Sequence, residues 1–166
     1  MNNLLYYPIY YLNLDRSSNR NKRMIEMFKK YKIINYTRIS GIDGNNIDPC
    51  MCKKKRNFKY IGTYDNIKYE INPINKMNIY EVGTLLSHYK ALLEIKKNND
   101  NIAIICEDDI SLECYNKWNT NIKTIVKNAP NNWQVIKIGT NNPNLLKKII
   151  TNKELYLKDI PLKANW

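Results

Sequence analysis

The chain alternates between short apolar runs and longer amphipathic stretches, and this alternation predicts an α/β fold. Residues 8–13 form an apolar run with β-branched and aromatic side chains, which is typical of a buried strand. Behind a serine that can cap a helix, either Ser17 or Ser18, apolar residues recur at helical spacing as far as Tyr31. Residues 33–40 then alternate between two faces and predict a second strand.

The second half of the chain continues the same pattern. Residues 78–97 carry an apolar stripe at helical spacing, and residues 102–106 are a continuous apolar run of the kind found in the centre of a parallel sheet. A further helix over 114–127 and a strand over 133–139 are expected. Strands alternating with helices across short connections predict a mostly parallel sheet within a single domain over residues 1–166.

Residues 48–76 separate the two halves and show no regular pattern. We expect a long loop with one short strand at 68–71, and a loop of this length in a compact domain is usually functional or mobile. The basic run Lys53–Arg56 is interpreted as a solvated part of this loop, since the chain has no recognised nucleic-acid-binding signature. No nucleic-acid partner is therefore expected.

Composition supports a globular chain but says little about its partners. The 166 residues are 43% hydrophobic and carry a formal charge of +12, and a chain of this length can bury roughly 70% of its unfolded surface. Asn, Ile, Lys and Tyr are all over-represented, and all four have A/T-rich codons. Part of the positive charge therefore reflects genome composition, as in a virus with an A/T-rich genome, rather than a binding surface.

The sequence indicates a reduced, cytoplasmic setting. No apolar run reaches the about 18 residues of a membrane-spanning helix, and the opening residues lack the features of a secretory signal. Cys50 and Cys52 are poorly spaced for bridging each other, and Cys106 lies in an apolar run. A zinc site would need a second ligand pair, and the lone His88 lies far along the chain. We expect unpaired thiols in a cytoplasmic protein, in the host cytoplasm or a virion if the source is viral.

Three polar segments each follow a predicted strand. They are residues 13–16, 41–44 and 107–109. Ligands of parallel α/β sheets bind at the carboxyl ends of the strands, so we expect these segments to form one site.

The third segment contains three consecutive carboxylates, Glu107, Asp108 and Asp109. Such neighbours raise one another's pKa unless a cation compensates them, and hard oxygen ligands suit Mg²⁺ or Mn²⁺. Because alternate side chains of a strand share a face, Glu107 and Asp109 are expected to point together and Asp108 to the opposite side. The alternative is that Asp108 and Asp109 cap the next helix while Glu107 is solvated.

The first segment is open to two interpretations as well. Asp15 favours the macrodipole at a helix N-terminus, and the nearby Arg16, Arg20 and Arg23 can be a solvated helix face. Basic groups and backbone N–H groups at a helix start also suit a diphosphate.

Together the segments resemble five motifs of glycosyltransferase family 25, in the order of that family. The matching stretches are Ile9–Arg20 (INLDR), Arg38–Gly44 (R-x-x-A-x-D-G), Glu81–His88 (E-x-G-x-x-x-SH), Ile104–Ile110 (LxLEDDV) and Trp133–Gly139 (W-D-x-x-x-LG). The family includes bacterial lipooligosaccharide galactosyltransferases and collagen galactosyltransferases. The resemblance implies a GT-A fold with a Rossmann-like sheet flanked by helices.

The resemblance also implies a role for individual residues. It places nucleotide-sugar binding on Asn13, Leu14, Asp15, Arg16, Asp43, Gly44, Glu81 and Asp108. It places the metal, Mn²⁺ or Mg²⁺, on Glu107 and Asp109, and catalysis on Asp109 and His88. Gln134 stands where the family usually has Asp, and Thr84 where it often has Cys. Because the family continues beyond the Trp133 segment, we expect a C-terminally truncated member.

The implied reaction is transfer of a hexose, galactose or glucose, from a UDP-sugar to a hydroxyl acceptor on a glycan or a hydroxylated protein. It would be metal-dependent and inverting, with a carboxylate or His88 accepting the proton of the acceptor hydroxyl. The ring of His88 can instead be hydrogen-bonded only within the fold. The alternative function is a catalytically inactive basic binding module, which the truncation, Gln134 and the positive charge favour.

Within the triplet, Glu107 is expected to be the buried carboxylate that pairs with protein donors, and Asp109 to lie nearer the cleft. Glu107→Gln should then lower stability. Asp109→Asn should lose metal-dependent donor binding with little change in melting temperature.

Overall fold

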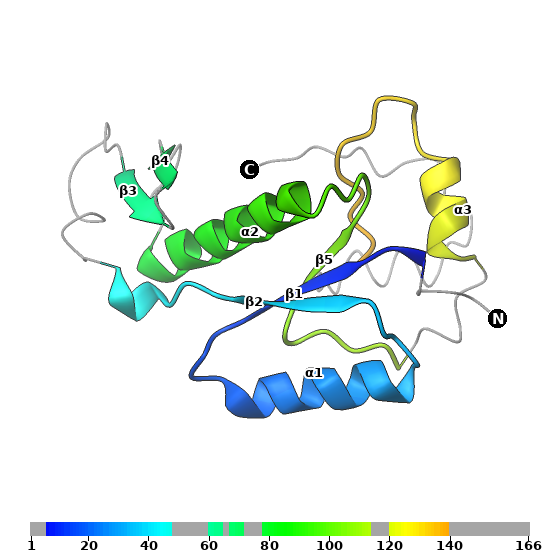
Figure 1. Cartoon of the computed structure of the whole chain (residues 1–166), viewed down its shortest axis with the longest axis horizontal. Coiled ribbons are helices and arrows are strands. Elements are labelled where there is room, and N and C mark those ends of the chain that lie inside the picture. The colour runs from blue at the N-terminus through cyan, green and yellow to red at the C-terminus, as the bar shows by residue number, and fades with distance from the viewer. Residues whose placement is uncertain (1–5, 48–59, 65–66, 72–77, 114–119, 140–166) are drawn as a thin grey trace, which may run out of the picture. The chain divides into compact units, whose positions relative to one another are not determined.

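The computed structural model of the protein describes residues 6–47, 60–64, 67–71, 78–113 and 120–139. The elements in chain order are β1 (Ile9–Asn13), α1 (Ser18–Lys30), β2 (Tyr36–Ser40), the 3₁₀ turn η2 (Gly44–Asn46), β3 (Tyr60–Tyr64), β4 (Ile67–Ile71), α2 (Ile79–Lys97), β5 (Ile104–Glu107) and α3 (Ile122–Lys127). Figure 1 shows them along the chain. The predictions for Cys50, Cys52 and Lys53–Arg56 lie outside the described residues.

Within the described residues, the main sheet has three parallel strands in the order β2-β1-β5. Asn13 at the end of β1 lies opposite Ser40 of β2, and Leu12 lies opposite Glu107 of β5. The carboxyl ends of the three strands therefore meet at one edge, as the sequence predicts for a Rossmann-like α/β protein. Among the described strands, β1 rather than β5 has the central position expected for residues 102–106: β1 is buried at all five residues and lies between the other two strands, whereas β5 is only partly buried.

Helices α1 and α2 cover opposite faces of this sheet (Figure 1). Side chains alternate along β1, so Tyr10 and Leu12 pack with Ala91 of α2 on one face. On the other face, Tyr11 packs edge-on against Phe28 of α1, with ring centroids 5.4 Å apart. Tyr10, Tyr11 and Phe28 are at most 1% exposed, and burial of such large rings dominates the stability of the layers.

A capping box begins α2. The Asn78 side chain accepts hydrogen bonds from the backbone N–H groups of Tyr80 and Glu81, both at 2.9 Å. Glu81 in turn accepts from the backbone N–H of Asn78 at 2.7 Å. These bonds satisfy donors that a helix N-terminus leaves free, so the first turn of α2 has a fixed position.

Two predicted elements differ from the structure, and one strand was not predicted. The strand expected at 68–71 is confirmed as β4, and it pairs antiparallel with the unpredicted strand β3. Helix α3 begins at Ile122 rather than at residue 114; residues 114–119 are not described. Residues 133–139 do not form a strand. There Val135 and Ile138 are 59% and 39% exposed, and within the described part of the chain no strand pairs with this segment.

The chain divides into two compact units, residues 1–123 and 124–166. The first unit holds the parallel sheet, α1 and α2, and the described part of the second includes residues 124–139. Among the described helices, none is both long and apolar enough to cross a membrane.

Candidate functional site

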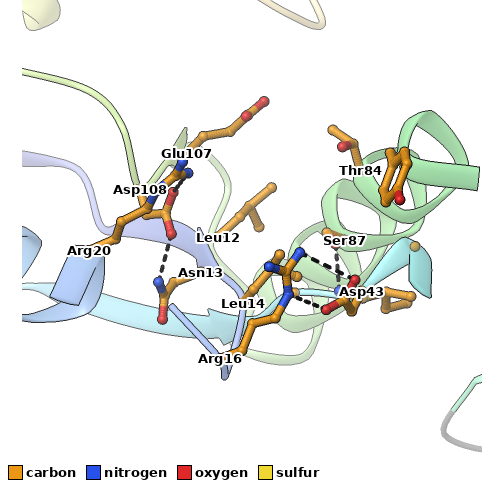
Figure 2. A pocket seen from close by; sticks show the side chains of 14 residues that line it. Leu12, Asn13, Leu14, Arg16, Arg20, Asp43, Thr84, Ser87, Glu107 and Asp108 are labelled. Carbon is orange, nitrogen blue, oxygen red and sulfur yellow. Dashed lines mark hydrogen bonds and ion pairs between the residues drawn. The ribbon is translucent and has the colours of Figure 1, made fainter. Parts of the chain in front are cut away.

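A cavity of about 190 Å³ lies at the carboxyl ends of the three parallel strands. Figure 2 shows side chains from the ends of β1 and β5, the turn after β2 and the first half of α2. The polar side chains that line the cavity are those of Asn13, Arg16, Arg20, Asp43, Tyr80, Thr84, Ser87, Glu107 and Asp108. The cavity therefore lies at the edge where ligands of parallel α/β sheets bind.

Asn13 and Asp108 form the buried base of this site, at 2% and 6% exposure. The Asn13 amide donates from Nδ2 to Asp108 Oδ2 at 2.6 Å. Arg20 on α1 donates to the other carboxylate oxygen at 3.0 Å, and Arg23 donates to the backbone carbonyl of Asp108 at 3.0 Å. The buried charge of Asp108 is thus both paired and hydrogen-bonded, which a buried carboxylate requires.

Arg38 connects the buried pair Asn13 and Asp108 to Asp15. Its Nε donates to Asn13 Oδ1 at 2.9 Å, and its Nη2 forms an ion pair with Asp15 at 2.6 Å. The Ser40 hydroxyl donates to the same carboxylate at 2.8 Å. The hydrogen bond from Ser40 and then that from Arg38 lower the pKa of Asp15. Asp15 does not line the cavity; it orients Arg38, which in turn fixes the Asn13 amide.

Arg16 and Asp43 form an ion pair at the cavity wall. Asp43 also caps η2, since its side chain accepts from the backbone N–H of Asn45 at 3.0 Å. The bond from Asn45 and then that from Arg16 lower the pKa of Asp43. Arg16, with its side chain 59% exposed, brings a guanidinium group to the cavity, where it is available to an anionic ligand.

The turn after β2 packs directly on α2. Ser87 Oγ accepts from the backbone N–H of Ile42 at 2.8 Å and donates to the carbonyl of Gly83 at 2.7 Å. A Cβ added to Gly83 would lie 2.7 Å from the Ile42 carbonyl oxygen, and one added to Gly44 would lie 2.8 Å from that of Ile79. Both glycines are therefore required by the close approach of the two backbones.

Glu107 is directed away from Asp108, toward α2 (Figure 2). Its Oε1 lies 3.4 Å from Nε2 of His88, and this contact lowers the pKa of the carboxyl group. The side chain of Glu107 is 52% exposed. The expectation that Glu107 is the buried carboxylate paired with protein donors is therefore wrong; that carboxylate is Asp108. The cause is the register, which places Glu107 on the face of α2 and Asp108 on the face of α1.

Seven of the residues assigned from the resemblance line the cavity: Asn13, Leu14, Arg16, Asp43, Gly44, Glu107 and Asp108. Four do not line it: Asp15, Glu81, His88 and Asp109. Glu81 is occupied in the capping box of α2, and His88 meets the cavity only through Glu107.

The arrangement of the carboxylates determines which of them is open to a metal ion. Among the described residues, no three His, Cys, Asp or Glu side chains lie together as a metal site. The strand ends at Glu107 and the chain turns at Asp108, so the alternation expected to align Glu107 with Asp109 does not continue. Asp108 faces away from Glu107 and has both oxygens bonded to Asn13 and Arg20. Glu107 is therefore the half-exposed carboxylate of the cavity that is open to Mg²⁺ or Mn²⁺, and phosphate oxygens and water would complete the shell.

Tyr80 was not predicted as a residue of the cavity, and Thr84 was identified only as a departure from a family motif. A signal was present in the sequence, because Tyr80, Thr84 and Ser87 recur at helical spacing and share one face of α2. Their face was obscured by the stronger apolar stripe of the same helix.

A parallel sheet between two helices, with a charged cavity at the carboxyl ends of its strands, is consistent with a Rossmann-like α/β fold. A family model described as "Glycosyltransferase family 25 (LPS biosynthesis protein)" matches residues 6–159. The chain therefore belongs to glycosyltransferase family 25, as the sequence motifs indicate, and is a transferase domain that acts on a sugar donor and an acceptor. Comparison with curated proteins and with solved structures found no match.

Proposed function

We propose that this domain transfers a hexose, galactose or glucose, from a UDP-sugar to a hydroxyl group of a glycan or a hydroxylated protein, with inversion, in a GT-A arrangement. The observation that carries the proposal is the cavity at the strand ends, which is lined by the guanidinium groups of Arg16 and Arg20 and by the half-exposed carboxylate of Glu107. The negative charge of a nucleoside diphosphate is commonly neutralised by guanidinium donors and by a divalent cation. The arginines of this cavity supply the donors, and its carboxylate can hold the cation.

Arg16 and Arg20 would bind the diphosphate. Arg16 is mostly exposed and bonded to Asp43, so it can exchange one anionic partner for another. Arg20 has a 59% exposed side chain and already bonds Asp108 through Nη1, which leaves its remaining N–H groups free to bind phosphate oxygens. The two arginines come from the start of α1 and the loop before it, where helix N–H groups add to the positive potential.

Glu107 would hold Mn²⁺ or Mg²⁺, with phosphate oxygens of the donor and water as the other ligands. The chemistry that such an ion supplies is stabilisation of the negative charge on the departing nucleoside diphosphate. His88 would hold Glu107 in position for this task, while Asp108, bonded to Asn13 and Arg20, keeps the Arg20 guanidinium at the cavity.

His88 would receive the proton of the acceptor hydroxyl. Its Nε2 lies 3.4 Å from Glu107 Oε1, and an imidazole is the commonest general base in enzymes. In an inverting reaction the hydroxyl attacks as the diphosphate departs on the opposite side, so a single general base suffices.

The test is calorimetric titration of the protein with UDP, with and without Mn²⁺. We expect Mn²⁺-dependent binding that EDTA abolishes and that Glu107→Gln weakens at least ten-fold, whereas Glu113→Gln, at an exposed carboxylate outside the cavity, leaves it unchanged. Transfer of radiolabelled hexose from UDP-galactose or UDP-glucose then identifies the donor. Absence of binding at millimolar UDP with Mn²⁺ would refute the proposal.

A second candidate function is the catalytically inactive binding module. It is supported by the engagement of both Asp108 oxygens by protein donors, which reduces what is left for a cation. In that case polyanions should bind with an affinity that falls steeply with salt and does not respond to Mn²⁺.

A further inference from the structure

Tyr80 is the exposed aromatic residue of the cavity. Its side chain lines the cavity and is 56% exposed, whereas Tyr10 and Tyr11 of the core are each 1% exposed. The ring therefore contributes little to the packing of the sheet and leaves most of its surface available. An exposed ring in a concave polar site is a surface on which a planar or apolar ligand group can stack.

The ring is held in place before any ligand binds. The capping box of Asn78 and Glu81 fixes the helical turn that carries it. Its hydroxyl donates to Asn45 Oδ1 at 3.2 Å. The backbone of Gly44 packs against the ring so closely that an added Cβ would lie 2.8 Å from Tyr80 Cδ1. A ring fixed in this way loses little conformational entropy when a ligand stacks on it.

The position of Tyr80 within the cavity decides which part of a ligand it meets. Tyr80 packs on the turn that follows β2, whereas Glu107 and Asp108 lie at the end of β5, and β1 separates these two strands. Two strand spacings amount to about 10 Å, comparable to the distance from the diphosphate of a nucleotide to its base. A ligand with its diphosphate near the carboxylates would therefore place its base, and not the transferred sugar, beside Tyr80.

We propose that Tyr80 is the stacking platform for the pyrimidine base of the nucleotide donor, and that the close contact with Gly44 and the bond to Asn45 serve to hold it there. This inference rests on the proposed function and adds the residue that recognises the base. In this arrangement the nucleotide base would be recognised beside the end of β2, and the phosphates beside the end of β5.

Two ligands that differ only in the base test this assignment. UDP and ribose 5-diphosphate are titrated calorimetrically into the unaltered protein and into Tyr80→Leu, Tyr80→Phe and Tyr89→Leu. Tyr89 is a matched control, because it is a 40% exposed tyrosine of the same helix that does not line the cavity. Thermal melting of each variant confirms that it folds.

We expect Tyr80→Leu to raise the Kd for UDP about ten-fold or more, in line with measured base-stacking energies, and to leave the Kd for ribose 5-diphosphate unchanged. Tyr80→Phe should keep the affinity for UDP within about three-fold, since it keeps the ring. Tyr89→Leu should change the Kd of neither ligand. Tyr80→Phe also serves if Tyr80→Leu does not fold: its Kd for UDP should then remain at least about ten-fold below that for ribose 5-diphosphate.

Equal losses for both ligands in Tyr80→Leu, or no loss for UDP, would overturn the assignment while leaving the proposed function intact. An increased KM for the acceptor with unchanged UDP binding would likewise overturn it and move Tyr80 to the acceptor side. If the unaltered protein does not bind UDP, the proposed function fails, and this inference fails with it.

Discussion

The side-chain amide of Asn13 donates to the carboxylate of Asp108 at 2.6 Å, and this buried bond joins two strands that are 95 residues apart in the sequence. The register explains the contact, since Leu12 pairs with Glu107 and the next residue of each segment falls on the face of α1. On that face, Arg20 donates a hydrogen bond to the second oxygen of the Asp108 carboxylate. Asn13 and Asp108 thus fix the end of β5 relative to β1 and hold the cavity in shape.

Replacement of Asp108 should lower stability. Asp108→Asn removes a buried charge that two protein donors satisfy, and the loss should cost about 1–3 kcal/mol in the free energy of unfolding. Urea denaturation followed by circular dichroism measures it. Asp109→Asn is the matched control, because Asp109 is exposed and should change the free energy of unfolding by less than about 0.5 kcal/mol. Equal effects of the two substitutions would show that the Asn13 contact does not stabilise the fold.

Glu107→Gln, by contrast, should leave stability almost unchanged while weakening Mn²⁺-dependent UDP binding. Its carboxylate is half exposed and contacts His88 alone among the described residues, and an exposed pair contributes little. Melting temperature and calorimetric Kd separate the two effects. A clear loss of stability without a loss of binding would assign Glu107 a structural role.

Gly44→Ala should destabilise the protein. The new methyl group would lie within 3 Å of the backbone at the start of α2, where flexible side-chain movement cannot relieve the clash. We expect a loss of about 1–3 kcal/mol in the free energy of unfolding. Gly139→Ala is the control, because a Cβ there would meet nothing within 4 Å. A melting temperature of Gly44→Ala equal to that of the control would contradict the close contact between the turn and α2.

The protein should lose stability at acid pH. The folded-state pKa values of Asp15 and Asp43 lie below the ordinary value of 3.8. A lowered pKa contributes stability that is fully present above the unfolded value and is lost as the pH falls through the folded value. Melting temperature should therefore decline between about pH 4 and pH 2. In Arg16→Gln, which removes one partner of Asp43, this decline should be shallower; an unchanged slope would exclude a contribution from the pair.

The thiol of Cys106 should react slowly. Burial, followed by the negative charges of Glu107, Asp108 and Asp109, raises its pKa to about 12. The reactive thiolate is then scarce near neutral pH. In a variant with Cys50, Cys52 and Cys114 changed to Ser, reaction with an aromatic disulfide reagent at pH 8 should be at least about a hundred-fold slower than that of glutathione. Rapid reaction would show that β5 opens readily.

The sequence predicted the parts of the fold that depend on local pattern. The apolar run at 8–13 is β1, and the amphipathic stretch after Asn78 is α2, because burial and capping are local signals. The gathering of residues 13–16, 41–44 and 107–108 at one edge also followed from the pattern, since it is a general property of parallel sheets.

The sequence did not predict which carboxylate is buried, because that depends on which helix covers which face. Leu12 and Glu107 share the face covered by α2, so Glu107 meets His88; Asp108 lies on the other face and meets Arg20. Nothing in the residues 107–109 themselves distinguishes these environments. The central position of β1 was likewise unpredictable, because strand order is set by pairing between segments far apart in the chain.

The bond between Asn13 and Asp108 also constrains how the protein folds. Because β1 pairs in parallel with β5 across most of the first unit, the loop that must close before this bond forms is long, and its closure carries a large entropic cost. Parallel pairings of high sequence separation form slowly. During synthesis β1 leaves the ribosome before β5, so one edge of this apolar strand stays unpaired until β5 arrives. The carboxylate end of the cavity is assembled at that last step, so binding competence should appear with the slowest phase of refolding.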